Sequence, residues 1–173
     1  MADQAEELRR SFRSEQQGSG RAAQWLAAYA ASHRHPTNKL LHWICVPLIV
    51  LALMGMLLVA PFPARLAAAL PGLDWASLAA CAAVAYYVAL SFRLAFGALL
   101  ALTALLLIAH GLAVLPWPVW RTSVLIFVLG WVGQFVGHAL EGKRPSFFQD
   151  LQFLLIGPLW LVAGAYRRLG LRY

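Results

Sequence analysis

Two polar clusters interrupt an otherwise apolar chain, and both contain residue types that bind transition metals. The first cluster begins at His33 and ends at His42, and the second contains Gln134, His138 and Glu141 at the end of an apolar run. The spacings of four and three residues in the second cluster place its side chains on one face of a helix. Ionisable groups at the edge of a membrane segment are costly, so these clusters need a partner or a function.

Imidazole and carboxylate side chains are ligands that suit Fe(II) or Zn(II). We predict that the two clusters meet and that His33, His42 and His138 bind one metal ion. Glu141 is then a fourth ligand or a hydrogen-bond partner of a ligating imidazole. Bonds of about 2.1 Å place the ring nitrogens within roughly 3–4 Å of one another. The alternative from the residues alone is a hydrogen-bonded polar network at the membrane interface.

Other polar residues of the two clusters admit more than one role. Asn38 lies four residues before His42, so both side chains can face the same neighbour. Gln134 lies one turn deeper than His138, where it either orients that ring or contacts a substrate. Glu141 has a plainer alternative, a salt bridge with one of the basic residues that follow it.

The remaining charged and histidine residues are placed by their sequence context. Arg34 and Lys39 either attract an anionic substrate to the interface or only set the membrane topology. His35 is either a further ligand or a group that faces lipid phosphates, and the following proline predicts an extended backbone there. His110 lies near the opposite end of an apolar run, so we expect it to be isolated and locally hydrogen-bonded.

The composition is typical of an integral membrane protein. Apolar residues make up 61% of the 173 residues, and charged residues make up 12%, about half the usual fraction. The net charge of +7 does not indicate nucleic-acid binding, because the basic residues flank apolar runs. We therefore predict membrane lipids as partners and no nucleic acid, with the oligomeric state left open.

The elements that must position the clusters are predicted to form an all-α, integral membrane four-helix bundle. Residues 1–20 are predicted to be a polar mobile tail, and residues 21–173 a single membrane domain. A short interfacial helix is expected over residues 21–32, where tryptophan and tyrosine gather. Spans of roughly 20 residues are expected at 40–60, 75–92, 94–115 and 119–140.

The last part of the chain is predicted to form short interfacial or re-entrant helices over residues 146–165. We expect a break between them at Gly157-Pro158, because proline removes a helix donor and clashes with the preceding turn. Basic residues concentrate before the first span and after the fourth. This asymmetry predicts a bacterial inner-membrane protein with both termini and both clusters on the cytoplasmic side. An even number of spans brings the two clusters to the same membrane face.

The first cluster resembles the N-terminal signature of the Mpo-like 2-hydroxy fatty acid dioxygenases in the pattern Tyr29-x3-His33-x4-Asn38-x3-His42, followed by Pro47. The second cluster resembles a later signature of that family in Trp131, Gln134, Gly137-His138, Glu141 and Arg144-Pro145. A closing Gly157-Pro158-Leu159-Trp160 is similar too. The resemblance covers about residues 27–170, nearly the whole chain after the polar tail.

The resemblance implies an Fe(II)-dependent, membrane-embedded dioxygenase of fatty acid α-oxidation. Such an enzyme converts a 2-hydroxy fatty acid to the acid one carbon shorter, using O2. Motif matching makes His33, His42 and His138 the essential histidines, supported by Asn38, Gln134 and Glu141. Zn(II) is the alternative occupant of the site. The rival reading is a non-enzymatic membrane scaffold or lipid-binding protein whose histidines form a structural, zinc-stabilised cap.

Overall fold

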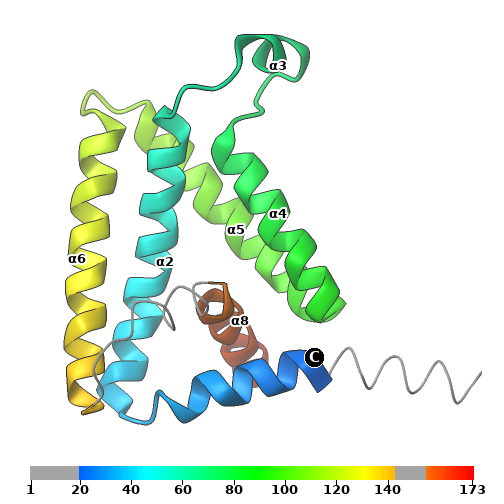
Figure 1. Ribbon diagram of the computed structural model, residues 1–173, viewed down its shortest axis with the longest axis vertical. Helices are drawn as coiled ribbons and strands as arrows, with labels where there is room; N and C mark the ends of the chain where they lie inside the picture. The colour runs from blue at the N-terminus through cyan, green and yellow to red at the C-terminus, as the bar shows by residue number, and fades with distance from the viewer. Residues whose placement is uncertain (1–19, 143–154) are drawn as a thin grey trace, which may run out of the picture.

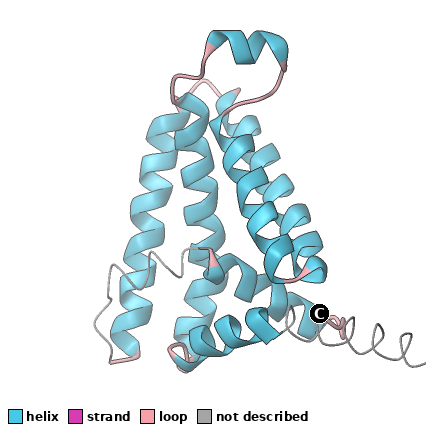
Figure 2. Ribbon diagram, turned by 45° about the vertical axis from the view of Figure 1, so that its right-hand side comes forward, coloured by secondary structure: helices cyan, strands magenta, loops and turns pink. Residues whose placement is uncertain are grey.

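The computed structural model describes residues 20–142 and 155–173 of the chain. Helices joined by short loops make up these residues, and no strand occurs among them (Figure 2). The predicted all-α class is therefore confirmed. Residues 20–31 form a helix that lies across one end of the bundle, and this end also carries α8 (Figure 1). We call it the histidine end, and the opposite end, capped by α3 (Ala64–Ala69), the far end.

Four helices run alternately between the two ends. They are α2 (Pro36–Val59), α4 (Trp75–Leu90), α5 (Phe92–Ala113) and α6 (Val119–Leu140). These bounds follow the four predicted spans closely, with the largest difference at the start of α2. Three of them, α2, α5 and α6, are long and apolar enough to cross a membrane. The fourth, α4, is apolar but has only 16 residues.

Local capping chemistry decides where these helices begin. His35 is the extended N-cap of α2, as predicted, and its Nδ1 accepts a hydrogen bond from the Thr37 N–H at 3.2 Å. The following proline occupies the first helical position, where a missing N–H costs nothing. At the far end, Asp74 and Ser77 form a reciprocal capping box at the start of α4. The caps thus place the polar cluster at the first turns of α2.

Glycines on α6 allow α2 to approach it closely. A Cβ added to Gly133 would overlap the Cys45 side chain, and one added to Gly137 would overlap Asn38. Small residues at helix interfaces let backbones come together, which is how apolar helices gain packing in membranes. The two helices lie side by side along their length (Figure 1). Their histidine-bearing ends are therefore held next to each other.

The last helix begins close to the predicted break. Helix α8 runs from Ile156 to Arg168 and packs against α2 and α5 at the histidine end. Gly157 and Pro158 lie within its first turn, so a helix begins within two residues of the predicted break, and the predicted helix before the pair falls outside the described residues. The first N–H groups of a helix have no intrahelical partner, and a proline there disrupts no hydrogen bond. The earlier part of the predicted 146–165 region falls mostly outside the described residues.

The helix over residues 20–31 confirms the helix predicted at 21–32, and its place in the membrane interface stays a prediction. Its inner face buries Ala22, Leu26 and Tyr29, whereas Trp25 is 42% exposed. The predicted polar tail lies outside the described residues except for Gly20. This helix, α8 and the last described residue all lie at the histidine end (Figure 1). The side of the membrane that this end faces stays a prediction from the charge distribution.

Candidate metal centre

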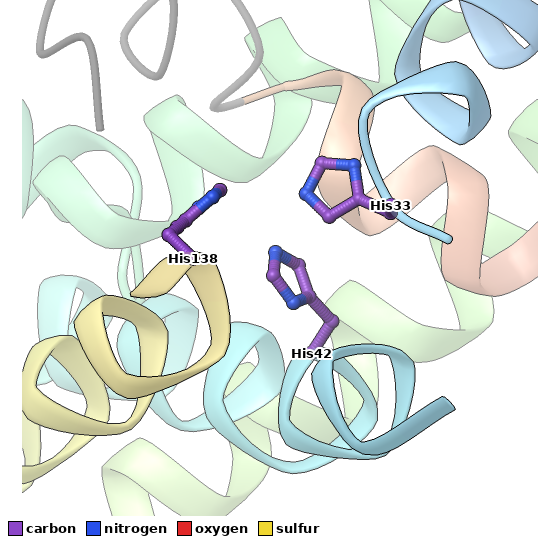
Figure 3. A group of neighbouring side chains, drawn as sticks. All are labelled: His33, His42 and His138. Atoms are coloured by element: carbon purple, nitrogen blue, oxygen red, sulfur yellow. The ribbon is translucent and has the colours of Figure 1, made fainter. Parts of the chain in front are cut away.

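Three imidazole rings converge at the histidine end. His33 comes from the turn after the first helix, His42 from α2 and His138 from the last turn of α6 (Figure 3). One nitrogen of each ring lies within 4.8 Å of the corresponding nitrogens of the other two. The ring centroids are 4.3 Å apart for His33 and His42, and 5.4 Å apart for each pair that includes His138. The two polar clusters therefore meet, as the span count predicted.

Main-chain carbonyls orient two of these rings. His33 Nδ1 lies 2.7 Å from the Tyr29 carbonyl oxygen, and His42 Nδ1 lies 2.9 Å from that of Asn38. A carbonyl oxygen only accepts, so each Nδ1 carries a proton and each Nε2 keeps its lone pair in the neutral ring. Hydrogen bonds of this kind fix the tautomer and orientation of ligating histidines. Both rings are buried, at 3% and 1% exposed.

This donor set fits a first-row transition metal. Neutral imidazoles suit Fe(II) and Zn(II), and three protein ligands leave positions for other molecules. The 4.8 Å spacing is somewhat wider than the predicted 3–4 Å, so ligation requires the three rings to move closer together. The half-buried His138 lies in the last turn of α6, where such a movement disturbs little packing.

Aromatic side chains cover one side of the histidine pair. Tyr29 stacks on His33 with ring centroids 4.1 Å apart and an interplanar angle of 15°. Trp160 of α8 lies 5.5 Å from the Tyr29 ring and 6.2 Å from the His33 ring. The sequence analysis gave neither aromatic residue a role in the site. The only signal for them was their place within the resembled signatures.

Glu141, at the edge of the site, connects the end of α6 to the start of α2 through hydrogen bonds. Its Oε1 accepts hydrogen bonds from the His35 N–H at 2.7 Å and from Asn38 Nδ2 at 3.0 Å. Partial burial alone would raise the pKa of this carboxyl, but the bonds from Asn38 and His35 hold that pKa below its ordinary value. Glu141 is not a member of the group formed by the three histidines. Its role as a fourth ligand stays a prediction, and Lys143 and Arg144 lie outside the described residues.

A small cavity opens between the rings and the apolar helices. Its volume is about 60 Å³, and His42, His138, Gln134 and Trp131 are among the residues that line it. Gln134 is only 6% exposed, and its Nε2 has no hydrogen-bond partner among the described residues. The Trp131 Nε1 is likewise buried without a partner among them. Buried donors are almost always satisfied by protein groups or by water, so these two are available to donate to a molecule in the cavity.

The other predicted contact residues lie further from the rings. Asn38 is fully buried, and it joins His42 and Glu141 through its carbonyl and its amide. Arg34 is exposed on the turn before α2. Lys39 borders a wide groove of about 690 Å³ beside His33, together with Arg167 and Arg168 of α8.

His110 lies at the far end, as predicted, but it is not isolated. Its Nδ1 lies 2.9 Å from the Leu106 carbonyl oxygen, and its Nε2 lies 3.1 Å from Asp74 Oδ2. The prediction of a local hydrogen bond is therefore confirmed, and the prediction of isolation is wrong. Asp74 therefore uses one carboxylate oxygen to cap α4 and the other to contact His110 of α5.

A comparison with protein families finds a match over nearly the whole chain. The family model described as 2-hydroxy-palmitic acid dioxygenase Mpo1-like matches residues 20–169. This range contains all three converging histidines and every helix described above. No curated protein and no solved structure matches the chain.

Proposed function

The chain belongs to the Mpo1-like family, and we propose that it is an Fe(II)-dependent, membrane-embedded dioxygenase. In this proposal it converts a 2-hydroxy fatty acid to the acid one carbon shorter, using O2. The observation that carries the proposal is the convergence of His33, His42 and His138 at one end of an apolar helical bundle. The family description supplies the class of reaction, and the geometry supports a place for it.

The three histidines would hold the ion. When bound, Fe(II) with three protein ligands supplies open positions for O2 and for oxygen donors of the substrate. The carbonyls of Tyr29 and Asn38 hold the rings of His33 and His42 in one tautomer. The Asn38 side chain also donates to Glu141. Asn38 therefore connects the His42 ring on α2 to the C-terminal end of α6. Through these contacts the chain keeps the ligand nitrogens facing one another.

Two buried donors would position the polar end of the substrate. Gln134 Nε2 and Trp131 Nε1 line the same cavity as His42 and His138, and both lack a partner among the described residues. An unsatisfied buried donor costs about 1–3 kcal/mol, which a ligand oxygen recovers. We infer that these groups bind the carboxylate or the 2-hydroxyl oxygen. The exposed cations Arg34 and Lys39 would raise the local concentration of an anionic substrate at the rim.

The test combines metal analysis with turnover. Protein purified without oxygen is analysed for iron and zinc, and then incubated with 2-hydroxypalmitate, Fe(II) and O2. We expect iron in the protein, oxygen uptake, and the acid one carbon shorter by mass spectrometry. Replacing Gln134 by Ala should raise the KM, whereas His110→Ala, at the far end, should behave as wild type. Stoichiometric zinc with no oxygen uptake would instead support the non-enzymatic, zinc-capped protein.

A further inference from the structure

A second cavity, entirely apolar in character, lies between α2, α5 and α8. Its volume is about 290 Å³, and α5 contributes Ala98, Ala101, Leu102, Ala104 and Leu105 to its lining. Tyr87 of α4 also borders it but directs its hydroxyl group to the Leu155 carbonyl oxygen, 2.7 Å away. A cavity without free polar groups does not hold water well. Its natural occupant is therefore hydrocarbon.

This cavity adjoins the candidate metal centre. Val46, Val50 and Pro158 line both the apolar cavity and the small cavity that contains His42 and His138. The small cavity, at about 60 Å³, has the volume of about two water molecules in the liquid. It can hold the reacting end of a long amphiphile but not its tail. The tail of a substrate seated at the histidines would enter the apolar cavity by passing these three shared residues.

Small residues on α5 create the space. Three alanines, at positions 98, 101 and 104, lie on the cavity side of α5 where larger side chains would fill the gap to α2 and α8. The opposite face of α2 packs closely on α6 through glycines, whereas this apolar cavity lies on the side of α2 that faces α5 and α8. On its outer side the cavity reaches Trp43, which also borders the basic groove.

We propose that this apolar cavity binds the hydrocarbon tail of the acyl substrate and that the α5 alanines limit its length. The inference rests on the proposed function, because the polar end of the same molecule must lie at the histidines. The class of reaction does not specify where the hydrocarbon tail of the substrate binds. The cavity supplies a site for it, since each methylene moved from water into apolar surroundings favours binding.

The first test measures chain-length preference. Ala101→Phe places a ring in the cavity, and its kcat/KM for 2-hydroxypalmitate should fall about tenfold or more relative to 2-hydroxyoctanoate. Leu105→Ala enlarges the cavity and should shift the preference toward longer chains. Ala85→Phe is the matched control, because Ala85 is exposed on α4 and does not line the cavity. If Ala101→Phe fails to fold, Ala104→Leu makes a smaller obstruction with the same expected direction.

The second test locates the tail without requiring turnover. A 2-hydroxypalmitate analogue with a diazirine at its tail end is photolysed with the metal-free protein, and labelled peptides are mapped by mass spectrometry. We expect labels on residues 98–105 and 161–165, reduced at least tenfold by Ala101→Phe. Labels confined to the outer face of α6, around Leu125 and Val128, would place the tail in the bilayer and overturn the inference. Cavity labelling without turnover would instead remove the proposed reaction and keep the tail site.

Discussion

The two ends of the bundle use the same histidine contact for different purposes. At the far end, His110 bonds a carbonyl of its own helix through Nδ1 and pairs with Asp74 through Nε2, and its side chain is 46% exposed. At the histidine end, His33 and His42 make the same kind of carbonyl bond, but their rings are almost fully buried. Each of them also lies beside two other imidazole rings.

The difference indicates which feature distinguishes a candidate metal centre from an ordinary surface histidine. The bond from Nδ1 to a carbonyl occurs at both ends, so it does not identify a ligand by itself. What differs is the surroundings of the ring: a carboxylate and solvent for His110, and other buried imidazoles for His42. A single exposed pair of this kind contributes about 0–1 kcal/mol. Three converging imidazoles provide a ligand set for one ion.

Removing one histidine ring from each end should give the largest difference, in metal content and in activity. His42→Ala should lose the bound metal and the activity together, because two imidazoles remain where three converge. Most of the α2–α6 packing lies between the histidines and the far end. Circular dichroism should therefore still show a folded helical protein. His110→Ala should keep the metal-to-protein ratio of wild type. The metal-to-protein ratio is measured by elemental mass spectrometry. An equal ratio in the two variants would contradict the predicted difference between the two ends.

Adding one methyl group to each end should give an intermediate contrast in stability. Gly137→Ala inserts a Cβ into Asn38, so we expect a loss of about 1–3 kcal/mol in unfolding free energy and weaker metal binding. Gly111→Ala, near the far end, meets no atom within 4 Å and should stabilise α5 by up to about 1 kcal/mol. Thermal unfolding in detergent measures both. A stabilising Gly137→Ala would show that the α2–α6 contact is not tight.

Acidification should produce the smallest effect, and it should depend on Glu141. Its hydrogen bonds lower the pKa of the carboxyl in the folded protein, so they stabilise the fold above the unfolded pKa of about 4.3. That contribution is lost as the pH falls through the lowered folded pKa. The metal-free Glu141→Gln variant should have a lower melting temperature at pH 7, and its difference from wild type should shrink below pH 4. A difference that grows on acidification would contradict this assignment.

The sequence predicted the helices because apolar runs and their prolines are local signals. It placed the start of the first span at residue 40, whereas His35 caps a helix that begins at Pro36. The last helix likewise begins at Ile156, one residue before the Gly157-Pro158 pair at which a break was predicted. These differences concern element boundaries, which local composition does not determine.

The site was predictable only in part, for a different reason. The meeting of His42 and His138 followed from counting spans, because an even number returns the chain to the same end. The partners of Glu141 depend on where the His35 N–H points, and no spacing reveals that direction. The apolar cavity depends on how α8 packs between α2 and α5, which is a property of the assembled bundle.

X-ray absorption at the iron edge tests the central claim most directly. The protein, loaded with one Fe(II) per chain without oxygen, is compared with His33→Ala, His42→Ala and His138→Ala treated in the same way. We predict imidazole scattering from three nitrogen ligands at about 2.0–2.2 Å in the wild-type protein, and its loss with the iron in each variant. Iron bound with no imidazole scattering, or bound equally by all three variants, would contradict the shared histidine site.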